Sequence, residues 1–165
     1  MSCQALWAGL VLLAACAPRN AGSSAAENTE SRQAPVITLE RTSCFGICPV
    51  YRLSVKTEGR VSYQGKAHVR HMGEASGRIS PDQVEALLSE IDQAGYFSFA
   101  DRYTANDSAC GRYATDSPSA VVSVQLQGRT KRIEHDHGCS SAPSALGILE
   151  RRIDEVLGSG QWTGR

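Results

Sequence analysis

Neither sign of charge predominates in this sequence. It has 17 lysine and arginine residues and 17 aspartate and glutamate residues, so its formal net charge is zero. Proteins that bind nucleic acid or an anionic membrane surface through charge usually carry a basic excess. The balance therefore predicts no nucleic-acid partner, while the apolar share of 41% is ordinary for a globular domain.

The sequence also lacks the short motifs that identify common active sites. It has no glycine-rich phosphate loop, no Gly-x-Ser-x-Gly nucleophile turn and no His-Glu-x-x-His zinc helix. No internal repeat is visible either. These absences favour a protein that is not an enzyme and predict no cofactor.

The first 15 residues contain no charged side chain, and Ala5 to Ala15 is an unbroken run of small and apolar residues. A membrane-spanning helix needs about 20 such residues, so the run instead suits the core of a signal peptide. It ends in Leu13-Ala14-Ala15-Cys16, which resembles the lipobox of bacterial lipoproteins. The resemblance implies that residues 1–15 are removed and that Cys16 is acylated, for example with palmitate. An ordinary cleaved signal or a short buried helix are the alternatives.

Two or three acyl chains give stable membrane anchoring where one chain does not. The residue after Cys16 is Ala17, and lipoproteins with a non-acidic residue there are commonly sorted to the outer membrane of two-membrane bacteria. We therefore expect a lipid-anchored protein of the cell envelope, on the outer membrane and facing the periplasm. Residues 16–34 are small and polar and predict a flexible tether, and residues 35–165 predict a single domain.

Strand patterns occur in pairs within that domain. Tyr51, Leu53 and Val55 alternate with polar residues, and a Glu58-Gly59 turn leads into a second alternating run. Another hairpin is predicted from Ala120 to His137, around Gln127-Gly128. The segment 67–72 either extends the first hairpin or leaves it, and residues 100–118 predict a long loop.

Helical patterns separate and follow the hairpins. Ser80-Pro81-Asp82-Gln83 combines a capping residue, a proline at the first helical position and a capping-box glutamine. A second helix is predicted from Pro143 to Leu157, with Leu146, Leu149, Ile153 and Val156 on one face. The order of strands, helix, strands, helix favours an α+β fold in which two helices pack on one face of an antiparallel sheet.

The run from Ser43 to Tyr51 reads SCFGICPVY. It resembles the CFGxCPxY signature of a bacterial family known as domain of unknown function 6438, and the likeness continues through nearly all of residues 36–163. The resemblance implies an α+β fold and an envelope setting. It implies neither an activity nor any catalytic residue.

Four cysteines remain once the signal peptide is removed and Cys16 is acylated: Cys44, Cys48, Cys110 and Cys139. An even number in an oxidising compartment indicates two disulfides, although four cysteines allow three pairings. We favour Cys44–Cys48, which closes a tight Phe-Gly-Ile turn, together with Cys110–Cys139. In the chain-entropy model the second bond is worth roughly 3 kcal/mol.

The same cysteines allow a sharper alternative. A CxxxC motif followed by proline is similar to the motif of thioredoxin-like copper-handling proteins, which pair it with a distal histidine; His135 or His137 would take that role. In those folds the motif begins a helix, which lowers a thiol pKa. Here it leads into a strand, which favours structural disulfides.

His135 and His137 are two residues apart in a predicted strand, so both lie on the same face. With Cys110 or Cys139 reduced, they would complete a nitrogen and sulfur metal site. No spacing matches a known metal motif, so we favour half-buried, hydrogen-bonded histidines. Arg41 is predicted to pair with Asp136 or Glu134.

Two functional hypotheses follow. The first is a membrane-anchored, non-enzymatic lipoprotein whose domain binds another protein of the envelope. The second is a periplasmic thiol-redox or metal-handling module that uses Cys44, Cys48 and one of the two histidines.

Overall fold

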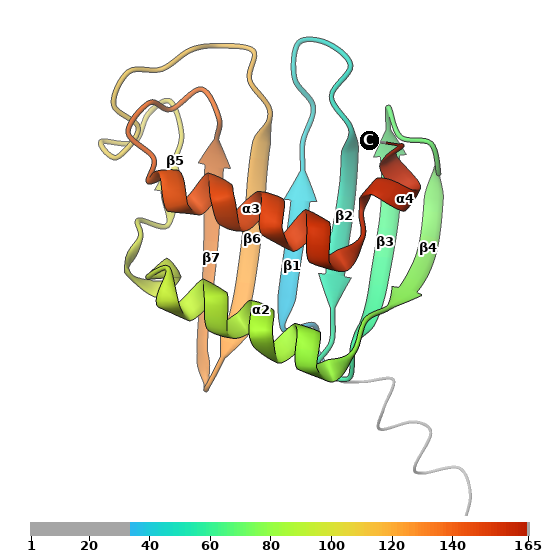
Figure 1. Cartoon of the computed structure of the whole chain (residues 1–165). Coiled ribbons are helices and arrows are strands. Elements are labelled where there is room, and N and C mark those ends of the chain that lie inside the picture. Colours follow the sequence, from blue (N-terminus) through green and yellow to red (C-terminus); the bar gives the residue numbers. More distant parts are fainter. Residues whose placement is uncertain (1–33, 165) are drawn as a thin grey trace, which may run out of the picture. The chain divides into compact units, whose positions relative to one another are not determined.

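The computed structural model describes residues 34–164, so the predicted signal peptide and Cys16 lie outside the described residues. Seven strands form one sheet in the order β4-β3-β2-β1-β6-β7-β5 (Figure 1). The strands are β1 Ile37–Arg41, β2 Val50–Val55, β3 Arg60–Ala67, β4 Gly73–Arg78, β5 Arg102–Tyr103, β6 Ser119–Leu126 and β7 Arg129–Asp136. The helices are α2 Pro81–Gln93, η1 Tyr96–Ser98, α3 Ser144–Leu157 and α4 Gly160–Thr163.

Both long helices, α2 and α3, lie across the same face of the sheet (Figure 1). The apolar residues of the alternating strands point toward them and form the core, which confirms the predicted α+β fold. Trp162 of α4 extends this core by stacking on Tyr63 at 4.8 Å between ring centroids. Within residues 34–164, no helix is long and apolar enough to cross a membrane.

Strand β1 lies at the centre of the sheet because it pairs with β2 on one side and β6 on the other. The register brings four positions into one row across the sheet: Tyr51 is opposite Arg41, Arg41 is opposite Ala120, and Ala120 is opposite His135. Directly opposite residues in adjacent strands point to the same face. This row therefore faces the helices and positions the site described below.

Two strands were not predicted from the sequence. The β4 segment, GEASGR, pairs with β3 at the exposed edge of the sheet. It contains no alternating apolar residues, so its sequence shows no strand pattern. The two-residue strand β5 lies inside the predicted long loop and pairs in parallel with β7. Edge strands carry a weaker hydrophobic pattern than central strands, since little of their surface is buried.

The predicted capping box is present at the start of α2. Ser80 Oγ accepts a hydrogen bond from the backbone N–H of Gln83, and the Gln83 side chain accepts one from the backbone N–H of Ser80. These two bonds satisfy N–H groups that have no partner within the helix.

Replacing Ser80 with alanine removes one of these bonds, and we expect it to lower the free energy of unfolding by about 1 kcal/mol. Urea denaturation monitored by circular dichroism measures the change. Ser89→Ala in the middle of the same helix is the matched control, and its stability should equal or slightly exceed that of the wild type because alanine is the better helix former. Equal stability of the Ser80 and Ser89 variants would contradict the expectation.

Candidate functional site

Two disulfides join the four cysteines of the described domain. Cys44 is bonded to Cys48 within the β1–β2 loop, and Cys110 is bonded to Cys139, with Cα–Cα distances of 5.7 and 4.6 Å. This is the pairing that the sequence favours. The second bond is buried and ties the loop after β5 to the segment after β7.

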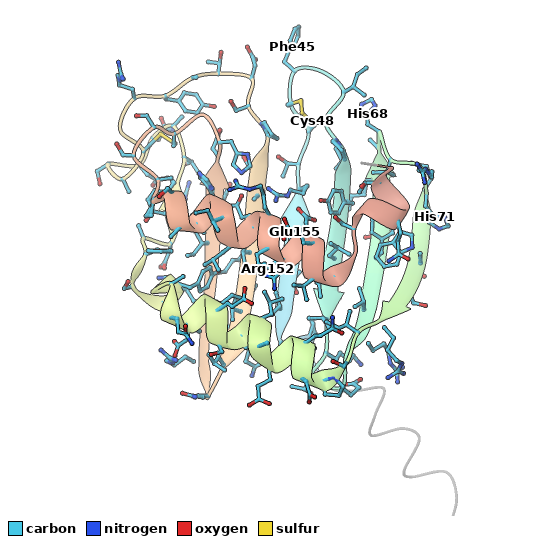
Figure 2. The ribbon with its side chains drawn as sticks, viewed as in Figure 1. Phe45, Cys48, His68, His71, Arg152 and Glu155 are labelled. Atoms are coloured by element: carbon cyan, nitrogen blue, oxygen red, sulfur yellow. A yellow bond between two sulfur atoms is a disulfide. The ribbon has the colours of Figure 1, made fainter. Side chains whose placement is uncertain are left out.

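The loop closed by Cys44 and Cys48 displays two apolar side chains. Phe45 is 89% exposed and Ile47 is 73% exposed, the highest values among the large apolar residues of the described chain. Figure 2 shows Phe45 at the tip of this loop, directed away from the sheet. The backbone N–H of Phe45 donates to the carbonyl of Asp116 at 3.1 Å, which fixes the loop to its neighbour.

A second feature lies under α3, where charged side chains enter the core. Glu150 and Asp154 are four residues apart on α3, so they lie on one face of the helix. That face contacts Tyr51, Arg41 and His135 of the row described above. Ala120 is fully buried and carries only a methyl group, which leaves room for the longer side chains on either side of it.

Glu150 is the most enclosed charged residue of this cluster, with 1% of its surface exposed. Its Oε1 is 2.7 Å from Nδ1 of His135, and its Oε2 is 2.7 Å from Nε2 of His137. Nη1 of Arg41 donates to Oε2 at 3.1 Å. Three polar side chains thus surround one buried carboxylate, as such a group requires in a low-dielectric interior.

Asp154 extends this arrangement along the helix. It accepts hydrogen bonds from Nε and Nη2 of Arg41 at 3.2 and 2.8 Å, and from the Tyr51 hydroxyl at 2.6 Å. Two nitrogens of Arg41 therefore donate to one oxygen of Asp154, Oδ2, while its remaining nitrogen reaches Glu150. Burial raises the pKa of Tyr51, and Asp154 raises it further by its charge and its hydrogen bond, so Tyr51 acts as a donor.

Burial alone would raise the pKa of Glu150, because it disfavours the charged form. The hydrogen bonds from His135 and His137, and the positive charges near it, outweigh this effect and lower the pKa to about 2. Glu150 is therefore ionised at neutral pH. The cluster then holds two carboxylates, a single guanidinium and two imidazoles.

The structure brings together the two histidines that the sequence singles out. His135 is buried beside Ile133 on the helix-facing side, and its ring centroid is 4.7 Å from that of His137. The predicted hydrogen-bonded environment is thus present. Cys110 and Cys139 are bonded to each other and offer no thiolate to a metal; the residue that lies beside the histidines is Glu150.

The predicted partner of Arg41 is wrong. Arg41 faces the helix layer and pairs with Glu150 and Asp154, whereas Asp136 accepts hydrogen bonds from Tyr113 and Gly138. Glu150 and Asp154 were missed by the sequence analysis. The available signal was Glu150 itself, since it occupies a position within the apolar stripe of Leu146, Ile153 and Leu157.

Residues 35–157 match the family described as a domain of unknown function, DUF6438. The matched segment contains both disulfides and all the residues of the cluster under α3. The match confirms the resemblance that the Ser43–Tyr51 signature suggests. Comparison with curated proteins gives no match.

Proposed function

Given that this chain belongs to the DUF6438 family, a domain of unknown function, we propose from its own features that it is a lipid-anchored envelope protein that binds a protein partner through the Cys44–Cys48 loop. The observation that carries the proposal is the exposure of Phe45 and Ile47 on one short loop. Single exposed apolar residues are common on protein surfaces, whereas neighbouring ones often mark an interaction site.

The loop is held in place before any partner binds. The disulfide closes it, Gly46 has a φ of +154° that a larger residue would adopt only with strain, and a backbone hydrogen bond joins Phe45 to Asp116. An ordered aromatic residue loses little conformational entropy on binding, so more of its burial appears as affinity. Aromatic residues are also frequent among those that dominate binding energy.

The uncovered face of the sheet is a weaker candidate for an apolar partner. Its residues include Ser54, Ser62 and Gln64, and Arg52 forms an ion pair with Glu40 there. Such a surface is suited to contact with water. The two most exposed large apolar side chains of the described chain lie instead on the β1–β2 loop.

The position of the loop fits an anchored protein. The described chain begins at Ala34, before β1, and the Cys44–Cys48 loop follows the far end of that strand. The loop therefore lies at the opposite end of β1 from the point where the proposed tether joins the domain. A partner on another envelope component can reach it without displacing the tether.

Site-specific photo-crosslinking in living cells tests the loop. We expect a photoreactive residue at position 45 of the full-length chain to give a defined protein crosslink. The same probe at Glu155, an exposed position on α3, should not give that crosslink. Replacing Ile47 with serine in the position-45 probe should weaken the crosslink. Crosslinks to lipid alone, or equal products from both positions, would overturn the proposal.

The thiol-redox alternative uses the same two cysteines, and intact mass separates it from a binding role. With thiol alkylation under mild reductant, we expect both disulfides of the purified protein to persist. Selective and rapid reduction of Cys44–Cys48 would instead favour thiol exchange at this loop.

The anchor is tested independently of the loop. Cys16→Ser should abolish metabolic labelling with palmitate and move the protein from the membrane fraction to the soluble fraction, because the acylated sulfur would be lost. Cys3→Ser is the matched control, since Cys3 lies within the predicted signal peptide and should leave labelling unchanged. Undiminished labelling of the Cys16 variant would exclude the proposed anchor.

A further inference from the structure

The cluster under α3 offers three metal-ligating atoms at one place. One ring nitrogen of His135, one ring nitrogen of His137 and a carboxylate oxygen of Glu150 all lie within 4.8 Å of one another. Nitrogen and oxygen ligands lie at about 2.0–2.2 Å from a zinc ion, so two ligands of one tetrahedral ion are about 3.4 Å apart. Side-chain movements of up to about 1.5 Å would therefore bring the three atoms to one ion.

The charges of the cluster favour a cation at this point. Nε and Nη2 of Arg41 both donate to Oδ2 of Asp154, which balances the guanidinium charge. Glu150 shares that guanidinium through a single contact, from Nη1 to Oε2 at 3.1 Å. A divalent ion between the three ligands would add a countercharge to Glu150 and would replace the contacts that the two imidazoles now make to the carboxylate.

The surrounding residues are also arranged as metal sites require. Carboxylate ligands are usually oriented by a hydrogen bond from a neighbouring group. Arg41 supplies such a bond to Oε2 of Glu150. Asp154 in turn accepts from Arg41, and the Tyr51 hydroxyl donates to Asp154. The Oε1 atom, now in contact with Nδ1 of His135, would become available once the ion replaces that contact.

Access to the site comes from the side of His137. Its side chain is 34% exposed, whereas those of His135 and Glu150 are 10% and 1% exposed. Three protein ligands with one open side leave a fourth position for water or for a ligand from another molecule. Imidazole with carboxylate suits zinc, copper and nickel, whereas calcium and magnesium prefer sites made of oxygen alone.

From this geometry we infer that His135, His137 and Glu150 form a binding site for a divalent transition-metal ion of the zinc and copper class. The site is distinct from the Cys44–Cys48 loop and uses no cysteine. Its ligands come from β7, from the residue just after β7, and from α3. Binding would therefore join the helix layer to the sheet.

Isothermal titration calorimetry with Zn²⁺ tests the inference on the full-length chain, purified in detergent without a histidine tag and with its disulfides intact. We expect one Zn²⁺ per chain, and an increase in the thermal unfolding temperature that EDTA reverses. Mg²⁺ at the same concentration should produce neither effect. Absence of stoichiometric Zn²⁺ binding to the wild type would overturn the inference.

Two histidine variants assign the site. His137→Gln removes the most exposed ligand, and we expect it to weaken Zn²⁺ binding at least tenfold. The double variant His68→Gln/His71→Gln is the matched control, because these exposed histidines near the β3–β4 connection are the other closely spaced pair (Figure 2). It should bind as the wild type does.

Folding is checked separately, so that loss of binding is not mistaken for loss of structure. Circular dichroism of the His137 variant without metal should match that of the wild type. If this variant unfolds, Co²⁺ absorption of the wild type decides: a tetrahedral spectrum that Zn²⁺ displaces supports the site, and an octahedral one contradicts it. Binding that the His68/His71 variant loses would also contradict it.

Discussion

Glu150→Gln is expected to lower the free energy of unfolding by about 3 kcal/mol, the low end of the cost of breaking a buried ion pair. The change keeps the size of the side chain but removes its charge. Arg41, His135 and His137 would then face a neutral amide that accepts through a single oxygen. Since Asp154 still binds Arg41, the loss should not exceed about 5 kcal/mol.

Glu155→Gln is the matched control, because it makes the same chemical change on the same helix. The Glu155 side chain is 67% exposed, and its contact with Arg152 is a surface ion pair. We expect its effect to lie within about 0.5 kcal/mol of zero. Urea denaturation of both variants, in the presence of EDTA, gives the comparison. Similar losses for the two variants would show that the cluster under α3 does not stabilise the fold.

Removal of the Cys110–Cys139 bond should have the second large effect. The bond joins residues 29 apart in sequence, and in the chain-entropy model a loop of this length is worth about 3–4 kcal/mol. Cys110→Ala/Cys139→Ala is therefore expected to lower the free energy of unfolding by about that amount. Both cysteines are buried, so alanine avoids leaving hydroxyl groups in the core.

The matched variant is Cys44→Ala/Cys48→Ala. Its loop is much shorter, with a separation of four residues, and the same model assigns it no more than about 2 kcal/mol. Chemical unfolding without reductant measures both variants. If the Cys44/Cys48 variant proves the less stable of the two, loop entropy is not the basis of their stabilising effects.

The local parts of the fold could be predicted from the sequence because neighbouring residues specify them. The Ser80–Gln83 capping box begins α2 where expected, and the alternation at Tyr51, Leu53 and Val55 places β2. Both Glu58-Gly59 and Gln127-Gly128 turn the chain as predicted, with Gly59 and Gly128 at positive φ. These features depend on contacts within a few residues.

The cluster under α3 could be predicted only in part, because its members are far apart in sequence. Strand periodicity predicts that His135 and His137 share a face. It does not predict which residue of α3 lies opposite them. Arg41 and Glu150 are 109 residues apart and meet only after β1, β7 and α3 have packed. A charged residue within an apolar helical stripe, together with two histidines on one strand face, is the pattern that would have indicated the contact.

The order of the disulfides along the chain bears on the export that we propose for it. Cys44–Cys48 precedes Cys110–Cys139 without interlacing, so each bond joins cysteines that are consecutive in the described domain. When such a chain crosses a membrane from its amino end, each cysteine can be oxidised with the next one to emerge. On the proposed export route, we expect the native pairing to form in order of arrival and to need no disulfide isomerase.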